Sequence, residues 1–174
     1  MRGSSRLSAR TEVPAGAPFE SNGPAQVESR SPNTPSKAPS KAKGKVRVVF
    51  VCIGNSCRSQ MAEAFAKAYG GDIVDAVSAG ISPAPDIAIQ TKRTLAEKNF
   101  SMDGHFPKGL ETMMHSPADL IVNMSGLPLT AKAGRTVTWK VQDPIGQNET
   151  VFRRVADEVE QLVMRLILEL RAKS

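Results

Sequence analysis

A cysteine and an arginine six residues apart are the pair in this sequence best suited to catalysis. Cys52 ends the apolar run 46–52, and Arg58 stands just before a helix-like segment. The N–H groups of such a strand-to-helix turn converge where the positive end of the helix dipole lies, so the turn predicts a site for a tetrahedral oxyanion. A thiol reacts as the thiolate, which a helix N-terminus and an arginine both favour. We therefore expect Cys52 to be a nucleophile and Arg58 to bind the anion through two N–H groups.

The residues around this pair complete the expected site. We expect the anion to be bound by the loop residues Ile53, Gly54, Asn55, Ser56, Cys57 and Arg58. Asn55 tolerates the left-handed conformation that such a loop requires, and Gly54 adopts it without cost. Ser59 is expected to donate its hydroxyl to the Cys52 thiolate, which stabilises the sulfur as a leaving group. The alternative interpretation of Cys52 is a core residue, because free cysteines are often buried.

The string from Cys52 to Ser59 resembles the phosphate loop of the low-molecular-weight protein-tyrosine-phosphatases and of the arsenate reductases that share their fold. The resemblance covers about residues 46–174. It implies a phosphotyrosine phosphatase I-like α/β fold with three layers, α/β/α, and a four-stranded parallel sheet of order 2-1-3-4. The alternation of strand-like and helix-like segments favours the same class, in which ligands bind at the carboxyl ends of the strands.

The resemblance assigns roles to residues outside the loop. Ser78 corresponds to a serine that braces the loop through Asn55, and Asp143, before Pro144, corresponds to the general acid. A carboxyl group has a task there, because the leaving oxygen must gain a proton and a water must later lose one. A turn or a helix start is the other interpretation of Asp-Pro. Lys108 lies near the position where some reductases carry an acidic residue of a potassium site, and its ammonium could supply that charge.

Apolar patterns predict the elements that position these residues. Strands are expected near 46–52, 73–79, 118–124 and 136–141, and helices near 59–69, 86–99 and 149–172. The last helix has apolar residues at spacings of three and four, which predicts one face packed on the sheet. Asn148 and Glu149 are candidates for its cap. Residues 101–117 are expected to form a loop or a short helix over the site.

Two enzyme activities and one binding function fit these residues. Hydrolysis of a phosphomonoester, with protein tyrosine phosphate as the implied substrate, needs only Cys52, Arg58, Asp143 and water. Arsenate reduction needs a further thiol, because two electrons leave as a disulfide. Residues 124–135 contain no cysteine, so glutathione or a redoxin would have to supply it. We predict a phosphatase that forms a phosphocysteine, with an external-thiol arsenate reductase or a non-catalytic phosphate-binding regulatory module as alternatives.

Three further features bear on redox chemistry, metals and specificity. The resemblance implies that Cys57 could form a disulfide with Cys52 as a reversible guard against peroxide. Neither His105 nor His115 has a partner at metal-ligand spacing, so we expect no metal and no cofactor. Family members that act on phosphotyrosine usually follow Asp-Pro with aromatic residues, whereas this chain has Ile145.

The first 45 residues differ in composition from the rest. They contain six of the twelve prolines and eight serines, and their eight Lys and Arg against three Asp and Glu account for +5 of the net charge of +6. We expect 1–45 to be a disordered basic tail and 46–174 to be one catalytic domain. The tail could touch nucleic acid or an anionic membrane, but a solvated linker without a specific nucleic-acid partner is expected. No apolar run is long enough to cross a membrane, and we expect a cytoplasmic monomer.

Overall fold

The computed structural model describes residues 44–173. The strands are β1 (Val46–Cys52), β2 (Val74–Gly80), β3 (Ala118–Asn123) and β4 (Ala133–Thr138), and the helices are α1 (Arg58–Gly70), α2 (Ile89–Glu97), α3 (Leu110–Met113) and α4 (Glu149–Arg171). The four strands form one parallel sheet in the order β2-β1-β3-β4. This is the predicted order, and it places the carboxyl end of β1 in the middle of one edge of the sheet.

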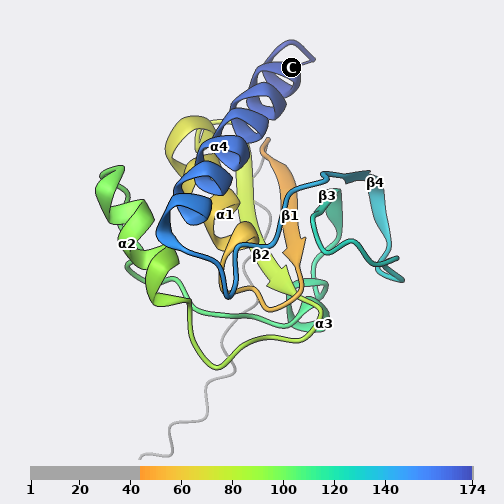
Figure 1. Cartoon of the computed structure of the whole chain (residues 1–174). Helices are drawn as coiled ribbons and strands as arrows, with labels where there is room; N and C mark the ends of the chain where they lie inside the picture. The colour runs from red at the N-terminus through yellow and green to blue at the C-terminus, as the bar shows by residue number, and fades with distance from the viewer. Residues whose placement is uncertain (1–43, 174) are drawn as a thin grey trace, which may run out of the picture. The chain divides into compact units, whose positions relative to one another are not determined.

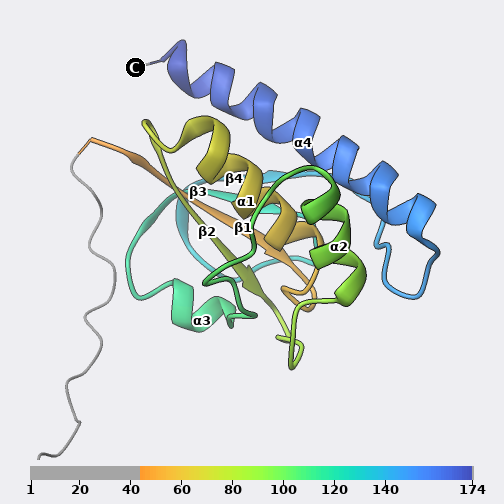
Figure 2. The same ribbon diagram turned by 90° about the vertical axis from the view of Figure 1, so that its left-hand side faces the viewer.

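Helices cover both faces of the sheet (Figures 1 and 2). Successive side chains of a strand point to opposite faces, and β1 is buried on both. Val48 and Phe50 belong to the larger core, which includes residues of α1 and α4. Val49 and Val51 belong to a smaller core, against which Leu110 of α3 packs. Figure 2 shows α4 and α3 on opposite sides of the sheet, so the three predicted layers are confirmed.

The long helix α4 packs one apolar face on the core, as predicted. Its buried residues are Phe152, Val155, Ala156, Val159, Val163, Leu166 and Ile167. Burial of a large apolar side chain contributes about 1.5–3 kcal/mol, so this face holds the helix against α1 and the sheet. The predicted cap is also present, because the side chain of Asn148 accepts a hydrogen bond from Val151 N at 3.1 Å.

Two predicted elements have different bounds in the structure. A strand was predicted near 136–141, but β4 begins at Ala133 and ends at Thr138. Its partner β3 ends at Asn123, whose carbonyl accepts a last hydrogen bond from Trp139 N at 2.9 Å, so later residues have no strand to pair with. The predicted helix 86–99 is shorter and begins at Ile89, because Ala88 has extended backbone with ψ 134°.

The segment 101–117 contains the short helix α3, in agreement with the sequence analysis. The predicted tail 1–45 lies outside the described residues except for Gly44 and Lys45, and Lys45 Nζ donates a hydrogen bond to Gly71 O. Within residues 44–173, no helix is long and apolar enough to cross a membrane.

Candidate active site

The loop between β1 and α1 turns its carbonyl groups outward. Backbone N–H groups of residues 81–88 donate at 2.9–3.2 Å to four of these carbonyls, those of Cys52, Ile53, Gly54 and Ser56. The amides of residues 53–57 have no hydrogen-bond acceptor among the described residues. Because these N–H groups lie beside the first turn of α1, the loop is able to bind an oxyanion through its backbone.

The loop conformation depends on one asparagine and one glycine. Asn55 has φ +47°, the left-handed conformation predicted for it, whereas Gly54 does not use a positive φ. Gly80, the last residue of β2, was not among the predicted site residues. A Cβ atom there would lie 2.8 Å from Ile53 O and 2.9 Å from Asn55 N. The close approach of β2 to the loop therefore requires glycine at this position.

Arg58 and Asp143, which were predicted to share the site, form an ion pair. Arg58 Nη2 lies 2.5 Å from Asp143 Oδ2. The other terminal nitrogen, Nη1, donates to Met124 O at 2.8 Å and to Val141 O at 3.3 Å. The arginine side chain is 6% exposed and that of Asp143 is 44% exposed. The guanidinium is thus held by one carbonyl just after β3 and one just after β4, while Asp143 contacts it from the surface.

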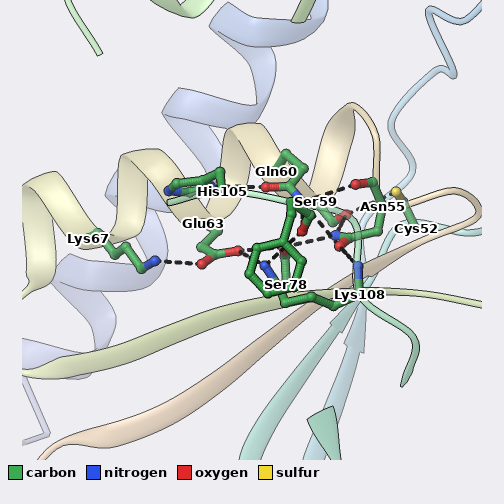
Figure 3. A network of polar contacts seen from close by, with 10 residues as sticks. Cys52, Asn55, Ser59, Gln60, Glu63, Lys67, Ser78, His105 and Lys108 are labelled. Atoms are coloured by element: carbon green, nitrogen blue, oxygen red, sulfur yellow. Dashed lines mark hydrogen bonds and ion pairs between the residues drawn. The ribbon is translucent and has the colours of Figure 1, made fainter. Parts of the chain in front are cut away.

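A chain of hydrogen bonds leads from the cysteine to a buried carboxylate (Figure 3). Cys52 Sγ lies 3.0 Å from Ser59 Oγ. Asn55 Nδ2 donates at 2.8 Å to the hydroxyl oxygens of both Ser59 and Ser78. Each serine can then donate its own proton elsewhere: Ser78 donates to Glu63 Oε2, and Ser59 has the sulfur as its partner. The geometry therefore brings together Cys52, Asn55, Ser59 and Ser78, as expected, with the Ser59 hydroxyl as donor to the sulfur.

Glu63 and Lys108 form the other end of this network (Figure 3). Lys108 Nζ lies 3.2 Å from Glu63 Oε2, and Lys67 Nζ lies 2.5 Å from Oε1. Burial alone would raise the pKa of Glu63, but the charges of Lys108 and Lys67 and the Ser78 hydroxyl outweigh it and hold that pKa below its usual value. A role was predicted from the sequence for Lys108 but not for Glu63. The spacing of Glu63 and Lys67 by four helical residues was the available signal.

Gln60 joins the segment before α3 to the loop. Its Nε2 donates to Asn55 O at 3.0 Å and to Phe106 O at 2.9 Å, and its Oε1 lies 2.9 Å from His105 Nδ1. Lys108 N donates to Asn55 Oδ1 at 2.7 Å. The pKa of His105 is lowered by its partial burial. Among residues 44–173 there is no group of three or more His, Cys, Asp or Glu that could hold a metal ion.

Comparison with known proteins decides the family. The model of the low molecular weight phosphotyrosine protein phosphatases matches residues 47–131. Arsenate reductase 1 of Bacillus cereus is 35% identical over 122 residues, which are 67% of this chain and 90% of that protein. The chain belongs to the low molecular weight phosphotyrosine protein phosphatase family. The family resemblance predicted from the loop is therefore confirmed.

Solved structures of both kinds of family enzyme share the fold. An arsenate reductase in the phosphate binding state is 28% identical with a TM-score of 0.65, over 72% of this chain and 98% of that one. The arginine phosphatase YwlE from Geobacillus stearothermophilus is also 28% identical with a TM-score of 0.65, over 74% of this chain and 94% of that one. The family thus consists of enzymes that include phosphatases and arsenate reductases.

The second cysteine of this family member lies in a different environment from the first. Cys57 precedes α1 at its N-cap position and, like Cys52, is 2% exposed. Burial raises its pKa to about 12, so at neutral pH it is a thiol. Both cysteines are free in the structure. Cys52, which has Ser59 beside it, is therefore the better candidate for the nucleophile of the two.

Proposed function

We propose that this protein is a cysteine-dependent phosphatase that hydrolyses phosphomonoesters through a phosphocysteine intermediate. The observation that carries the proposal is the meeting of Arg58 with Asp143, 2.5 Å apart, in a site whose free loop amides begin directly after Cys52. This arrangement contains an anion site, a nucleophile and a proton donor. It supports catalysis over a purely binding role, because an anion-binding module needs neither the sulfur nor the carboxyl group.

In the first step, Cys52 Sγ attacks phosphorus while the bond to the leaving oxygen breaks. The loop amides and Arg58 bind the non-bridging oxygens, whose charge they stabilise in the transition state. Asp143, as the carboxylic acid, gives its proton to the leaving oxygen. The products of this step are the free alcohol or phenol and a phosphocysteine.

In the second step, water attacks the phosphocysteine and gives a proton to the Asp143 carboxylate. The S–P bond breaks, inorganic phosphate leaves and the sulfur departs as a thiolate. The hydroxyl of Ser59, 3.0 Å from that sulfur, stabilises the negative charge by donating a hydrogen bond. The enzyme then has its original thiolate and a protonated acid.

Arsenate reduction with an external thiol is the second candidate, because the chain is 35% identical to an arsenate reductase. Cys52 would replace a hydroxyl group of arsenate to give a thiolate adduct and water. A thiol from glutathione or a redoxin would then attack the Cys52 sulfur, forming a mixed disulfide and leaving two electrons on arsenic as arsenite. A second external thiol would release Cys52. Cys57 is poorly suited to these attacks, because it is buried and protonated.

The decisive experiment compares both reactions with the full chain. Turnover is measured on 4-nitrophenyl phosphate, a phosphotyrosine peptide and phosphoarginine, and on arsenate with glutathione or a thioredoxin system. Hydrolysis that is lost in Cys52→Ser and retained in the surface variant Asp72→Asn is the expected result. Release of arsenite without any phosphate hydrolysis would show that the reductase assignment is the correct one.

A further inference from the structure

The free edge of the Arg58 guanidinium shows where an oxyanion would bind. Nη1 is occupied by two carbonyl groups. Nε is buried and has no hydrogen-bond partner among the described residues. Nε and Nη2 lie on one edge of the planar group and together form the fork that binds two oxygens of an oxyanion. On that edge only Nε is free, because Nη2 donates a hydrogen bond to Asp143 Oδ2 at 2.5 Å.

The nucleophile is covered in the same arrangement. Cys52 is 2% exposed and Arg58 is 5% exposed, so little of either residue is open to solvent while the ion pair is formed. The side chain of Asp143 is 44% exposed and is held otherwise by one hydrogen bond, from Ile145 N to Oδ1 at 3.2 Å. The arginine is anchored and buried, so the aspartate is the partner that is free to leave.

We propose that the Asp143 carboxylate is an internal competitor for the oxyanion site, occupying Nη2 of Arg58 until a substrate displaces it. The proposal rests on the proposed function, in which Arg58 binds the anion. A phosphate or arsenate dianion can offer one oxygen to Nε and another to Nη2, whereas the carboxylate contacts Nη2 alone. Displacement frees the Asp143 carboxylate from the arginine, so only once an anion is bound can it take up a proton from solvent and pass that proton to the leaving group.

This competition lowers the apparent affinity for every oxyanion by the fraction of molecules in which the edge is free. If Nη2 of Arg58 is free of Asp143 in about one molecule in ten, removing the carboxylate strengthens oxyanion binding about tenfold. Asp143→Asn removes the charge and keeps the shape, and Asp143→Ala removes both. Asp72→Asn makes the same change of charge at a surface ion pair with Arg171, 99 residues along the chain, and serves as the control.

The test is calorimetric titration of the full chain with inorganic phosphate, together with NMR of the Asp143 carboxyl carbon and the Arg58 Nε–H. We expect both Asp143 variants to bind phosphate about tenfold more tightly and Asp72→Asn to bind it as the wild type does. In the wild type, phosphate should shift both NMR signals, because the carboxylate loses its partner and Nε–H gains one. Unchanged phosphate affinity in both variants would overturn the proposal. An Asp143 carboxyl signal that does not shift when phosphate binds would also overturn it, because the ion pair would then stay intact and any gain in affinity would come from the loss of charge repulsion alone. A wild type that binds phosphate in this way but hydrolyses no ester would contradict the proposed function alone.

Discussion

At the scale of single residues, the site is defined by which hydrogen-bond donors have a partner and which do not. Asn55 supplies both of its amide protons to serine hydroxyls, which leaves Ser59 with a proton for the Cys52 sulfur. Arg58 donates through Nη1 to Met124 O, whereas its buried Nε has no hydrogen-bond partner among the described residues. The side chain of Asp143 is 44% exposed, and this fits the proposed exchange of protons with a leaving group and with water.

The proposed general-acid role of Asp143 predicts a dependence on the leaving group. Asp143→Ala should slow hydrolysis of an alkyl phosphate by about 10²–10³-fold, because an alkoxide needs its proton as the bond breaks. Hydrolysis of 4-nitrophenyl phosphate should fall much less, because nitrophenolate is a stable anion. The measurement is kcat for both substrates, with Asp72→Asn as the control. Equal losses on both substrates would remove the general-acid role.

The residues that act within one loop were accessible from the sequence, and those that act across elements were less so. Cys52, Arg58 and Ser59 lie within eight residues, so the strand-to-helix turn fixes their neighbourhood. Glu63 received no role, because a glutamate inside a helix usually faces solvent, and only the fold shows that Lys108 reaches it from 45 residues away. Asp143 was found through the family resemblance, and its pairing with the arginine depends on tertiary structure.

At the scale of elements, the loop is supported from three directions. The segment 81–88 binds its carbonyls, β2 packs against it through Gly80, and the segment 105–108 reaches Asn55 through Gln60 and Lys108. The order of strands was predictable from the resemblance. The end of β4 was not, because it depends on where the partner strand β3 stops and not on the apolar pattern of β4 itself.

Loss of the Lys108 ammonium should destabilise the protein in a pH-dependent manner. Lys108→Met leaves the buried Glu63 with Lys67 as its remaining cation, and we expect a loss of about 2–3 kcal/mol at pH 7. The lowered pKa of Glu63 contributes stability above about pH 4.3, its value in the unfolded chain, and this contribution is lost as pH falls through the folded value. The difference between wild type and variant should therefore shrink as the pH falls below the value of the unfolded chain and Glu63 becomes protonated.

Denaturant unfolding at pH 7 and pH 3.5 measures this difference. Lys92→Met removes the more exposed ion pair with Asp86 and should change stability by less than about 1 kcal/mol at both values. A difference for Lys108→Met that stays constant with pH would show that the methionine acts through packing and not through the charge of Glu63.

The ion pair between Lys108 and Glu63 also leads to a prediction about monovalent cations. Because the Lys108 ammonium already lies 3.2 Å from Glu63, no added cation is needed at this carboxylate. The kcat/KM for phosphate ester hydrolysis should be the same in sodium and in potassium chloride at equal ionic strength. Activation by potassium alone would contradict the role of Lys108 as the resident charge.

The contact between β2 and the loop predicts the effect of a single methyl group. In Gly80→Ala the new Cβ would lie under 3.0 Å from two backbone atoms of the loop, which cannot move without changing the anion site. We expect a loss of about 2 kcal/mol in stability and weaker phosphate binding. Gly109→Ala is the matched control, because its nearest neighbour is at 3.6 Å and its φ is −74°. Thermal unfolding and phosphate titration of both variants test this, and equal behaviour would contradict it.

At the scale of the whole molecule, charge and chemistry are separated along the chain. The first 45 residues account for +5 of the net charge of +6, whereas every residue of the proposed site lies between Cys52 and Asp143. The described ion pairs Glu63–Lys108 and Arg58–Asp143 are internal to the domain. The tail was predicted from composition alone, and its role as a solvated linker stays a prediction.

Removal of the tail tests this division. Lys45 donates to Gly71 O and Val46 N donates to Ile73 O at 2.8 Å, so the cut should be made before Gly44 to keep the start of β1. A chain of residues 44–174 should hydrolyse an aryl phosphate with a kcat/KM within about twofold of the full chain at 0.15 M salt, because screening over about 8 Å weakens the effect of distant exposed charges. Its melting temperature should be unchanged, because the composition of the removed segment predicts that it contributes no apolar core. A loss of activity that is confined to low salt would show the basic residues attracting anionic substrates. A loss at every salt concentration would mean that the tail forms part of the folded enzyme, and the domain boundary would have to be moved toward the N-terminus.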